Sequence, residues 1–137
     1  MTLSTLLTYI RALLGDEDAL RFSETLLTQA VRICLAEINL AAGQSYSLSG
    51  LDGGTLTSLP EGETQLLAIG AAGCAVRALN IRRADQHPLD EPVTVELTRL
   101  AAQLDARFSA ALEVIRRRGL ATSDQPPYAA IEPADSW

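Results

Sequence analysis

Hydrophobic residues recur every three or four positions over most of this 137-residue chain, which is the spacing of one face of an α-helix. The first such segment can be capped by Thr2 or Ser4, and Gly15 supplies the residue that commonly ends a helix. The second segment begins after Ser23, a favourable N-cap, and ends at Gly43. Both segments place apolar residues on one side, so we expect each to pack against a shared core.

The third segment has no polar face. Residues 66–76 are eleven consecutive positions without a charge or a side-chain amide or hydroxyl group. A membrane span needs about 20 apolar residues, so we predict a buried central helix instead. The helix is predicted to begin at the capping-box pattern of residues 58–61, and its helical pattern becomes weaker over residues 80–85. Gly70 and Gly73 lie in the apolar stretch, where we expect them to let neighbouring helices approach closely.

The longest helix is predicted over residues 92–118, with Gly119 at its end. Its apolar stripe faces inward, while arginines and glutamates occupy its outer face. A helix of this length spans about 40 Å and extends beyond the central helix. Residues 108–118 must therefore pack against the first two helices or against another subunit. The sequence therefore predicts an all-α fold over residues 1–119, a four-helix bundle around a buried central helix.

Residues 44–59 break the helical spacing, because apolar and polar residues alternate there around a glycine-rich turn. Tyr46, Leu48 and Leu51 lie before or within the turn, and Leu56 follows it. This pattern predicts a short β-hairpin that projects from the helical body. An ordinary glycine-rich loop packed on its own domain is an equally good interpretation.

The last segment, residues 120–137, has no periodicity. Pro126 and Pro127 exclude regular secondary structure and favour an extended chain. Three apolar residues are spaced along the segment: Tyr128, Ile131 and Trp137. We therefore predict an extended tail that docks on a partner chain through these side chains. The alternative is a tail that folds back on its own core.

The chain is acidic, with 17 acidic residues against 11 basic residues and a net charge of −6. Such a protein is a poor general binder of nucleic acids, because contacts to phosphates need a cationic surface. An acidic protein can nevertheless line a path for DNA without holding it. No signal-peptide pattern precedes the first helix, which predicts synthesis in a cytoplasm.

The sequence shows no recognisable catalytic, cofactor or metal site, so we expect a protein that is not an enzyme. The single histidine, His87, lies in a proline-flanked loop with no nucleophile placed near it. Cys34 and Cys74 lie on apolar helix faces, where we interpret them as small core residues rather than a disulfide or a metal-binding pair.

The one basic cluster, Arg116, Arg117 and Arg118, ends the longest helix. Its positive charge can simply complement the helix dipole, or it can form a docking patch for an acidic partner or for passing DNA. Arginine suits interfaces because its planar side chain pairs bidentately and is weakly hydrated. We therefore regard these residues, together with Arg107, as candidates for a subunit interface.

Four stretches follow one another along the chain: a helix over residues 3–16, the start of a second helix at residues 22–27, a polar ribbon that ends at residues 59–60, and an apolar helix at residues 66–72. In this order they resemble the small connector, or adaptor, proteins at the head-tail junction of tailed bacteriophages. The resemblance covers about residues 3–119 and consists of helix-boundary patterns rather than catalytic signatures.

The resemblance implies a helical bundle that assembles as a ring, commonly of twelve copies, beneath the portal protein. DNA would pass through the central channel without specific binding. The C-terminal segment commonly docks on the portal in such proteins, and the opposite face receives the next neck, stopper or tail-terminator protein. The expected location is the virion neck after synthesis in the host cytoplasm, with no membrane contact and no cofactor.

Two other interpretations remain open. A small helical packaging factor could bind nucleic acid through Arg116 to Arg118 and the first two helices. An enzyme with an unrecognised site would have a deep polar pocket around His87.

Overall fold

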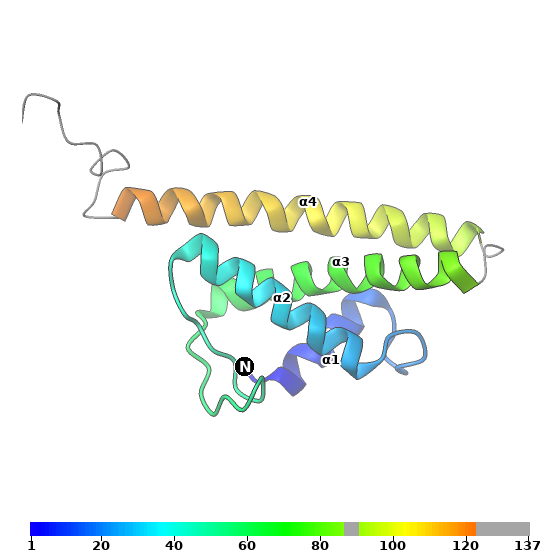
Figure 1. Ribbon diagram of the computed structural model, residues 1–137, viewed down its shortest axis with the longest axis horizontal. Helices are drawn as coiled ribbons and strands as arrows, with labels where there is room; N and C mark the ends of the chain where they lie inside the picture. Colours follow the sequence, from blue (N-terminus) through cyan, green and yellow to red (C-terminus); the bar gives the residue numbers. More distant parts are fainter. Residues whose placement is uncertain (87–90, 123–137) are drawn as a thin grey trace, which may run out of the picture.

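The computed structural model describes residues 1–86 and 91–122, and in these residues it consists of α-helices and connecting loops without a strand. The four helices described are α1 (Leu3–Leu14), α2 (Glu24–Ala42), α3 (Glu61–Gln86) and α4 (Glu91–Thr122). Helices α3 and α4 run antiparallel side by side, and α2 packs against both of them (Figure 1). Helix α1 packs on α2 and α3, and it does not contact the described part of α4. The predicted all-α class is confirmed.

Helices α1 and α2 begin and end at the capping residues that the sequence predicts. The side chains of Thr2 and Ser23 accept hydrogen bonds from the backbone N–H groups of Thr5 and Leu26, at 3.3 and 3.1 Å. Gly15 and Gly43 have φ values of 66° and 65°, the left-handed conformation that ends a helix at little steric cost. These caps explain why both helix boundaries could be predicted.

Helix α3 contacts all three other helices. Within the apolar stretch of residues 66–76, Ile69 and Cys74 are partly buried and every other residue is buried. Glu24–Ala42 and Glu61–Ile81 are long and apolar enough to cross a membrane by length and composition, but more than half of the α3 window is buried inside the protein. The buried core helix of a bundle has this same composition.

Helix α4 approaches α3 most closely at two glycines. A Cβ atom on Gly70 would lie 2.6 Å from the ring of Phe108, and one on Gly73 would lie 2.6 Å from Oδ1 of Asp105. Real Cβ atoms do not make contacts this short, so the Phe108 ring requires glycine at position 70, whereas at position 73 the carboxylate of Asp105 would have to shift. Close approach at Gly70 and Gly73 was predicted from the sequence, and the geometry confirms it.

Both long helices extend further than their sequence patterns predict. Helix α3 continues to Gln86, and α4 continues past Gly119 to Thr122. Gly119 is not among the glycines with a positive φ, so it does not end the helix. A Cβ atom there would meet the carbonyl oxygen of Ala41 at 3.9 Å, which places this turn of α4 against the end of α2. The C-terminal part of α4 therefore packs against α2.

Residues 43–60 form a loop, and the predicted projecting hairpin is absent from them. An isolated bridge between Thr2 and Ser49 is their only strand-like pairing. Leu48 and Leu51 are buried, Tyr46 is partly buried, and Leu56 is exposed. The loop packed on its own domain is thus the interpretation that fits.

Turns explain why the alternating pattern did not produce strands. Gly50 and Gly53 have φ values of 92° and 79°, and Asp52 between them has a φ of 50°. The backbone N–H of Leu51 donates to the carbonyl oxygen of Leu48 at 3.1 Å, so the two leucines lie on one tight turn. Both side chains then enter the core together.

Four long-range contacts fix this loop on the helices. The backbone N–H of Leu3 donates to the carbonyl of Ser49 at 2.8 Å, and Thr57 Oγ1 donates to the carbonyl of Met1 at 2.5 Å. The side-chain amide of Asn39 on α2 both donates to and accepts from the backbone of Tyr46. Arg32 on α2 forms a bidentate ion pair with Asp52, the shortest distance being 2.6 Å.

Candidate partner-binding surfaces

The predicted tail anchors and the single histidine lie outside the described residues: His87, Pro126, Pro127, Tyr128, Ile131 and Trp137. The docking role predicted for the tail therefore stays a prediction. Among the residues that are described, no group of three or more His, Cys, Asp or Glu side chains could hold a metal ion.

The connector between α1 and α2 is organised by a buried carboxylate. Asp16 is only 4% exposed, and its two oxygens accept backbone hydrogen bonds from Leu20, Arg21 and Phe22 at 3.0 to 3.1 Å. Arg11 completes the cluster with an ion pair to Asp16 at 3.1 Å and a hydrogen bond to the carbonyl of Phe22 at 2.8 Å. The sequence patterns did not predict this cluster.

The surroundings of Asp16 stabilise its ionised form. Burial by itself raises the pKa of this carboxyl group, but the backbone N–H groups of Phe22, Arg21 and Leu20 and the positive charge of Arg11 outweigh that effect. The net result is a pKa below the ordinary value of 3.8. Because all of its partners belong to the same connector and helix, Asp16 holds the fold together and does not form a ligand site.

The two cysteines are free thiols on neighbouring helices. Cys34 is buried in the core, as predicted, whereas Cys74 is partly buried. The interaction between the two thiols lowers the pKa of Cys74 and raises that of Cys34. The more acidic thiol is therefore the more exposed one.

The predicted interface arginines all lie on the exposed side of α4. Arg116 and Arg117 contact the carboxylate of Glu113 at 3.4 and 3.7 Å, which are weak surface ion pairs. Arg107, in contrast, forms no ion pair with any described residue, and neither does Arg99 two turns earlier on the helix. Arg99 and Arg107 thus present uncompensated positive charge.

Exposed apolar residues accompany these arginines. Val95, Val114 and Leu120 on α4 and Leu40 on α2 are about half exposed or more. Leu40 and Leu120 line one shallow groove between the C-terminal ends of α2 and α4, together with Arg116 and Gly119. Apolar side chains beside arginines are typical of surfaces that bind another protein.

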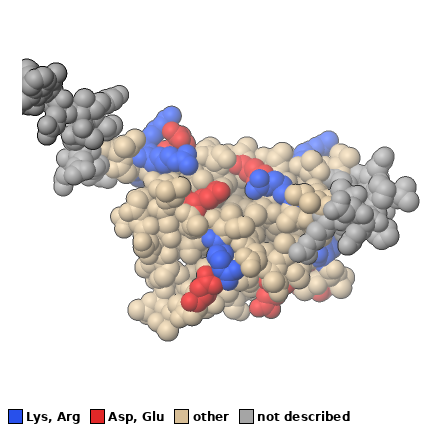
Figure 2. Space-filling view, in the orientation of Figure 1, with Lys and Arg blue, Asp and Glu red and all other residues tan. Residues whose placement is uncertain are grey.

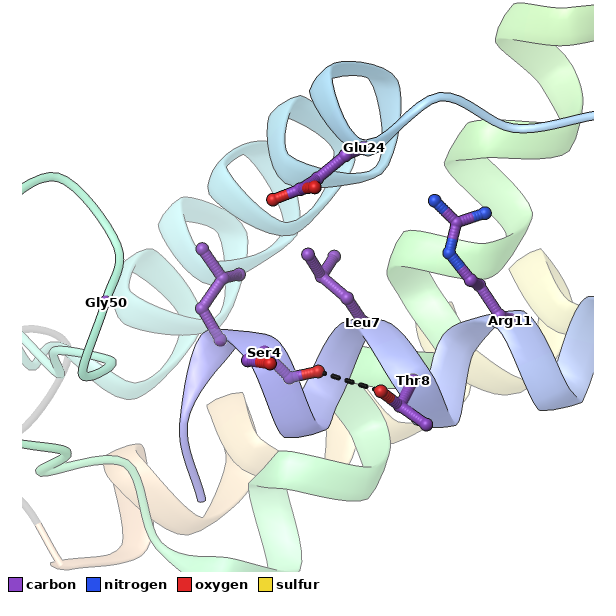
Figure 3. A pocket seen from close by; sticks show the side chains of 7 residues that line it. Ser4, Leu7, Thr8, Arg11, Glu24 and Gly50 are labelled. Carbon is purple, nitrogen blue, oxygen red and sulfur yellow. Dashed lines mark hydrogen bonds between the residues drawn. The ribbon is translucent and has the colours of Figure 1, made fainter. Parts of the chain in front are cut away.

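A second groove lies between α1 and the start of α2 (Figure 3). It has a volume of about 400 Å³, and none of the α4 residues whose side chains are described lines it. Its walls come from α1, from the first residue of α2 and from the glycine turn of the loop: Leu3, Ser4, Leu7, Thr8, Arg11, Glu24 and Gly50. The hydroxyl of Thr8 is already used, because it donates to the carbonyl of Ser4 at 3.1 Å. Among the described residues that line the groove, there is no pair of groups suited to nucleophilic catalysis.

Comparison of the chain with protein-family models, with curated proteins and with solved structures finds no match.

Proposed function

We propose that this protein is a head-tail connector, or adaptor, of a tailed phage, and that it forms a ring between the portal and the neck or tail. The ring is dodecameric in the proteins that the sequence resembles. Its channel would let the genome pass, and the protein would act as a structural part of the virion rather than as an enzyme. No cofactor or membrane contact enters this proposal.

The observation that carries the proposal is the outer side of α4. This helix is 32 residues long, and its outer side is exposed from end to end of the part whose side chains are described. Unpaired arginines and exposed valines share that side. A neighbouring copy could bury this surface and pair its arginines. In the proposed ring, α4 of one subunit packs on the flank of the next.

The tail supplies the second contact in this proposal. Helix α4 ends at Thr122, close to the groove that Leu40 and Leu120 line, and residues 123–137 follow it in the sequence. The segment contains Tyr128, Ile131 and Trp137, which would dock on the portal. Single apolar contacts are weak, but a ring presents many copies at once, and avidity multiplies their effect.

A truncation tests the docking role. A chain that ends at Thr122 keeps all four helices, so we expect it to form the same ring as the full-length protein but to lose binding to portal-bearing heads. Native mass spectrometry measures the ring, and co-sedimentation with heads measures docking. A triple variant with Tyr128, Ile131 and Trp137 replaced by alanine should reproduce the loss. Truncated protein that still joins heads normally would show that the tail does not dock.

A further inference from the structure

The groove between α1 and α2 contains a carboxylate that has no side-chain partner among the described residues. Glu24, in the first turn of α2, points into the space above Leu7 of α1 (Figure 3). Its carboxylate makes no ion pair and no side-chain hydrogen bond with any described residue. Among the described residues, Arg11 is the one arginine that lines the groove, and it already pairs with Asp16. The carboxylate of Glu24 is therefore available to a cationic side chain that reaches the groove.

A matching cationic side chain lies on α4. Arg107 is exposed and unpaired, and the residues beside it on the outer face, Ala106 and Ala110, are small and exposed. Small neighbours let another surface come close to the helix, so an arginine between them can extend into a groove. Arg107 cannot reach Glu24 of its own chain through direct packing, because the described part of α4 neither contacts α1 nor lines the groove.

Two segments of the chain carry opposite net charges. Residues 1–60 carry six acidic and three basic residues, a net charge of −3, whereas residues 95–121 carry five arginines and three acidic residues, a net charge of +2. In Figure 2, blue atoms lie along the upper edge, where α4 lies, with red atoms among them, and red atoms also lie along the lower edge. Opposite net charges on these two segments favour a head-to-tail contact between copies over a symmetric dimer, which would place like charges together.

We propose that Arg107 of one copy enters the groove between α1 and α2 of the next copy and pairs with Glu24. This proposal rests on the proposed ring and names the two faces that form it. A ring of twelve turns each copy by about 30° relative to the last, so its two contact faces lie nearly opposite each other, as α4 and α1 do here.

Charge reversal tests the pairing. We expect Arg107→Glu and Glu24→Arg each to weaken association between copies at least about tenfold, because each places like charges in contact. The double variant restores the opposite charges and should recover association to within about threefold of the wild type. Arg99→Glu combined with Glu24→Arg is the matched control, since Arg99 is an unpaired arginine on the same helix but not the assigned partner. Analytical ultracentrifugation at low ionic strength gives the association constants.

The outcomes separate this proposal from the ring itself. If the wild type forms a ring but the Arg107–Glu24 double variant assembles no better than the single variants, the pairing is wrong and the ring stands. If the wild type stays monomeric both alone and with portal, the ring is wrong and the pairing is wrong with it.

Thermal unfolding controls for misfolding of the variants. Both residues are exposed, so the unfolding temperature of each variant should match that of the wild type. A lower unfolding temperature would mean that lost assembly comes from misfolding. In that case Glu24→Gln and Arg107→Gln, which remove the charges without reversing them, must still weaken assembly for the pairing to stand.

Discussion

At the scale of single residues, Asp16 shows how one charge can fix a connector. Its carboxylate accepts three backbone N–H groups as well as the ion pair with Arg11. We expect Asp16→Asn to lower the free energy of unfolding at neutral pH by about 1.5–3 kcal/mol, the usual value of a hydrogen bond to a charged group. Urea unfolding followed by circular dichroism measures the loss. Asp18→Asn is the control, because Asp18 is exposed two residues away, and this substitution should have little effect.

The pKa of Asp16 adds a dependence on pH with a definite sign. A carboxyl group whose pKa is lowered by folding stabilises the protein above its unfolded value, here about 3.8. That contribution is lost as the pH falls through the lower, folded pKa. Wild-type stability should therefore decrease as the pH is lowered below about 4, and the Asn variant should lack this part of the decrease. An equally steep decrease in both proteins would assign the acid sensitivity to other carboxylates.

At the scale of secondary structure elements, the contact between α3 and α4 depends on Gly70. We expect Gly70→Ala to destabilise the protein by about 1–3 kcal/mol, because the new methyl group would overlap the ring of Phe108. Gly62 in the first turn of the same helix has open space around it, so Gly62→Ala should stabilise by up to about 1 kcal/mol through a stiffer unfolded chain. Chemical denaturation of both variants tests the contrast. Equal effects would mean that helix propensity, and not close packing, governs both sites.

The elements that could be predicted from the sequence are those fixed by local interactions. The caps at Thr2, Ser23, Gly15 and Gly43 act within one helical turn, so the sequence alone determines where α1 and α2 begin and end. The apolar run around Gly70 has no polar side at all, so its burial follows from composition.

The elements that could not be predicted depend on distant parts of the chain. Leu48 and Leu56 alternate with polar residues in the same way, yet Leu48 is buried and Leu56 is exposed, because contacts to Leu3 and Asn39 position one side of the loop. Gly119 resembles a helix end locally, yet α4 continues through it to Thr122 where the helix lies beside Ala41 at the end of α2. The groove at Glu24 likewise forms from α1, α2 and the loop together, and no periodicity could indicate it.

At the scale of the whole molecule, the distribution of charge separates a connector from a packaging factor that binds nucleic acid. The protein carries 17 acidic residues against 11 arginines, and the arginines on α4 are the ones we assign to contacts between copies. A packaging factor would instead keep Arg116 to Arg118 free for phosphates. The two functions therefore predict opposite results when the protein meets DNA.

We expect the wild type not to bind duplex DNA even at low ionic strength, where attraction to phosphates is strongest. Fluorescence anisotropy of a labelled duplex, titrated at several salt concentrations, measures this directly. A factor that neutralised three phosphates through Arg116, Arg117 and Arg118 would bind with a log–log salt slope of about −3, because each contact contributes about 0.9. Replacing these three residues with glutamine would then abolish the binding. Such a result would identify the cluster as a nucleic-acid surface, whereas no binding at any salt concentration leaves the arginines available for a protein partner.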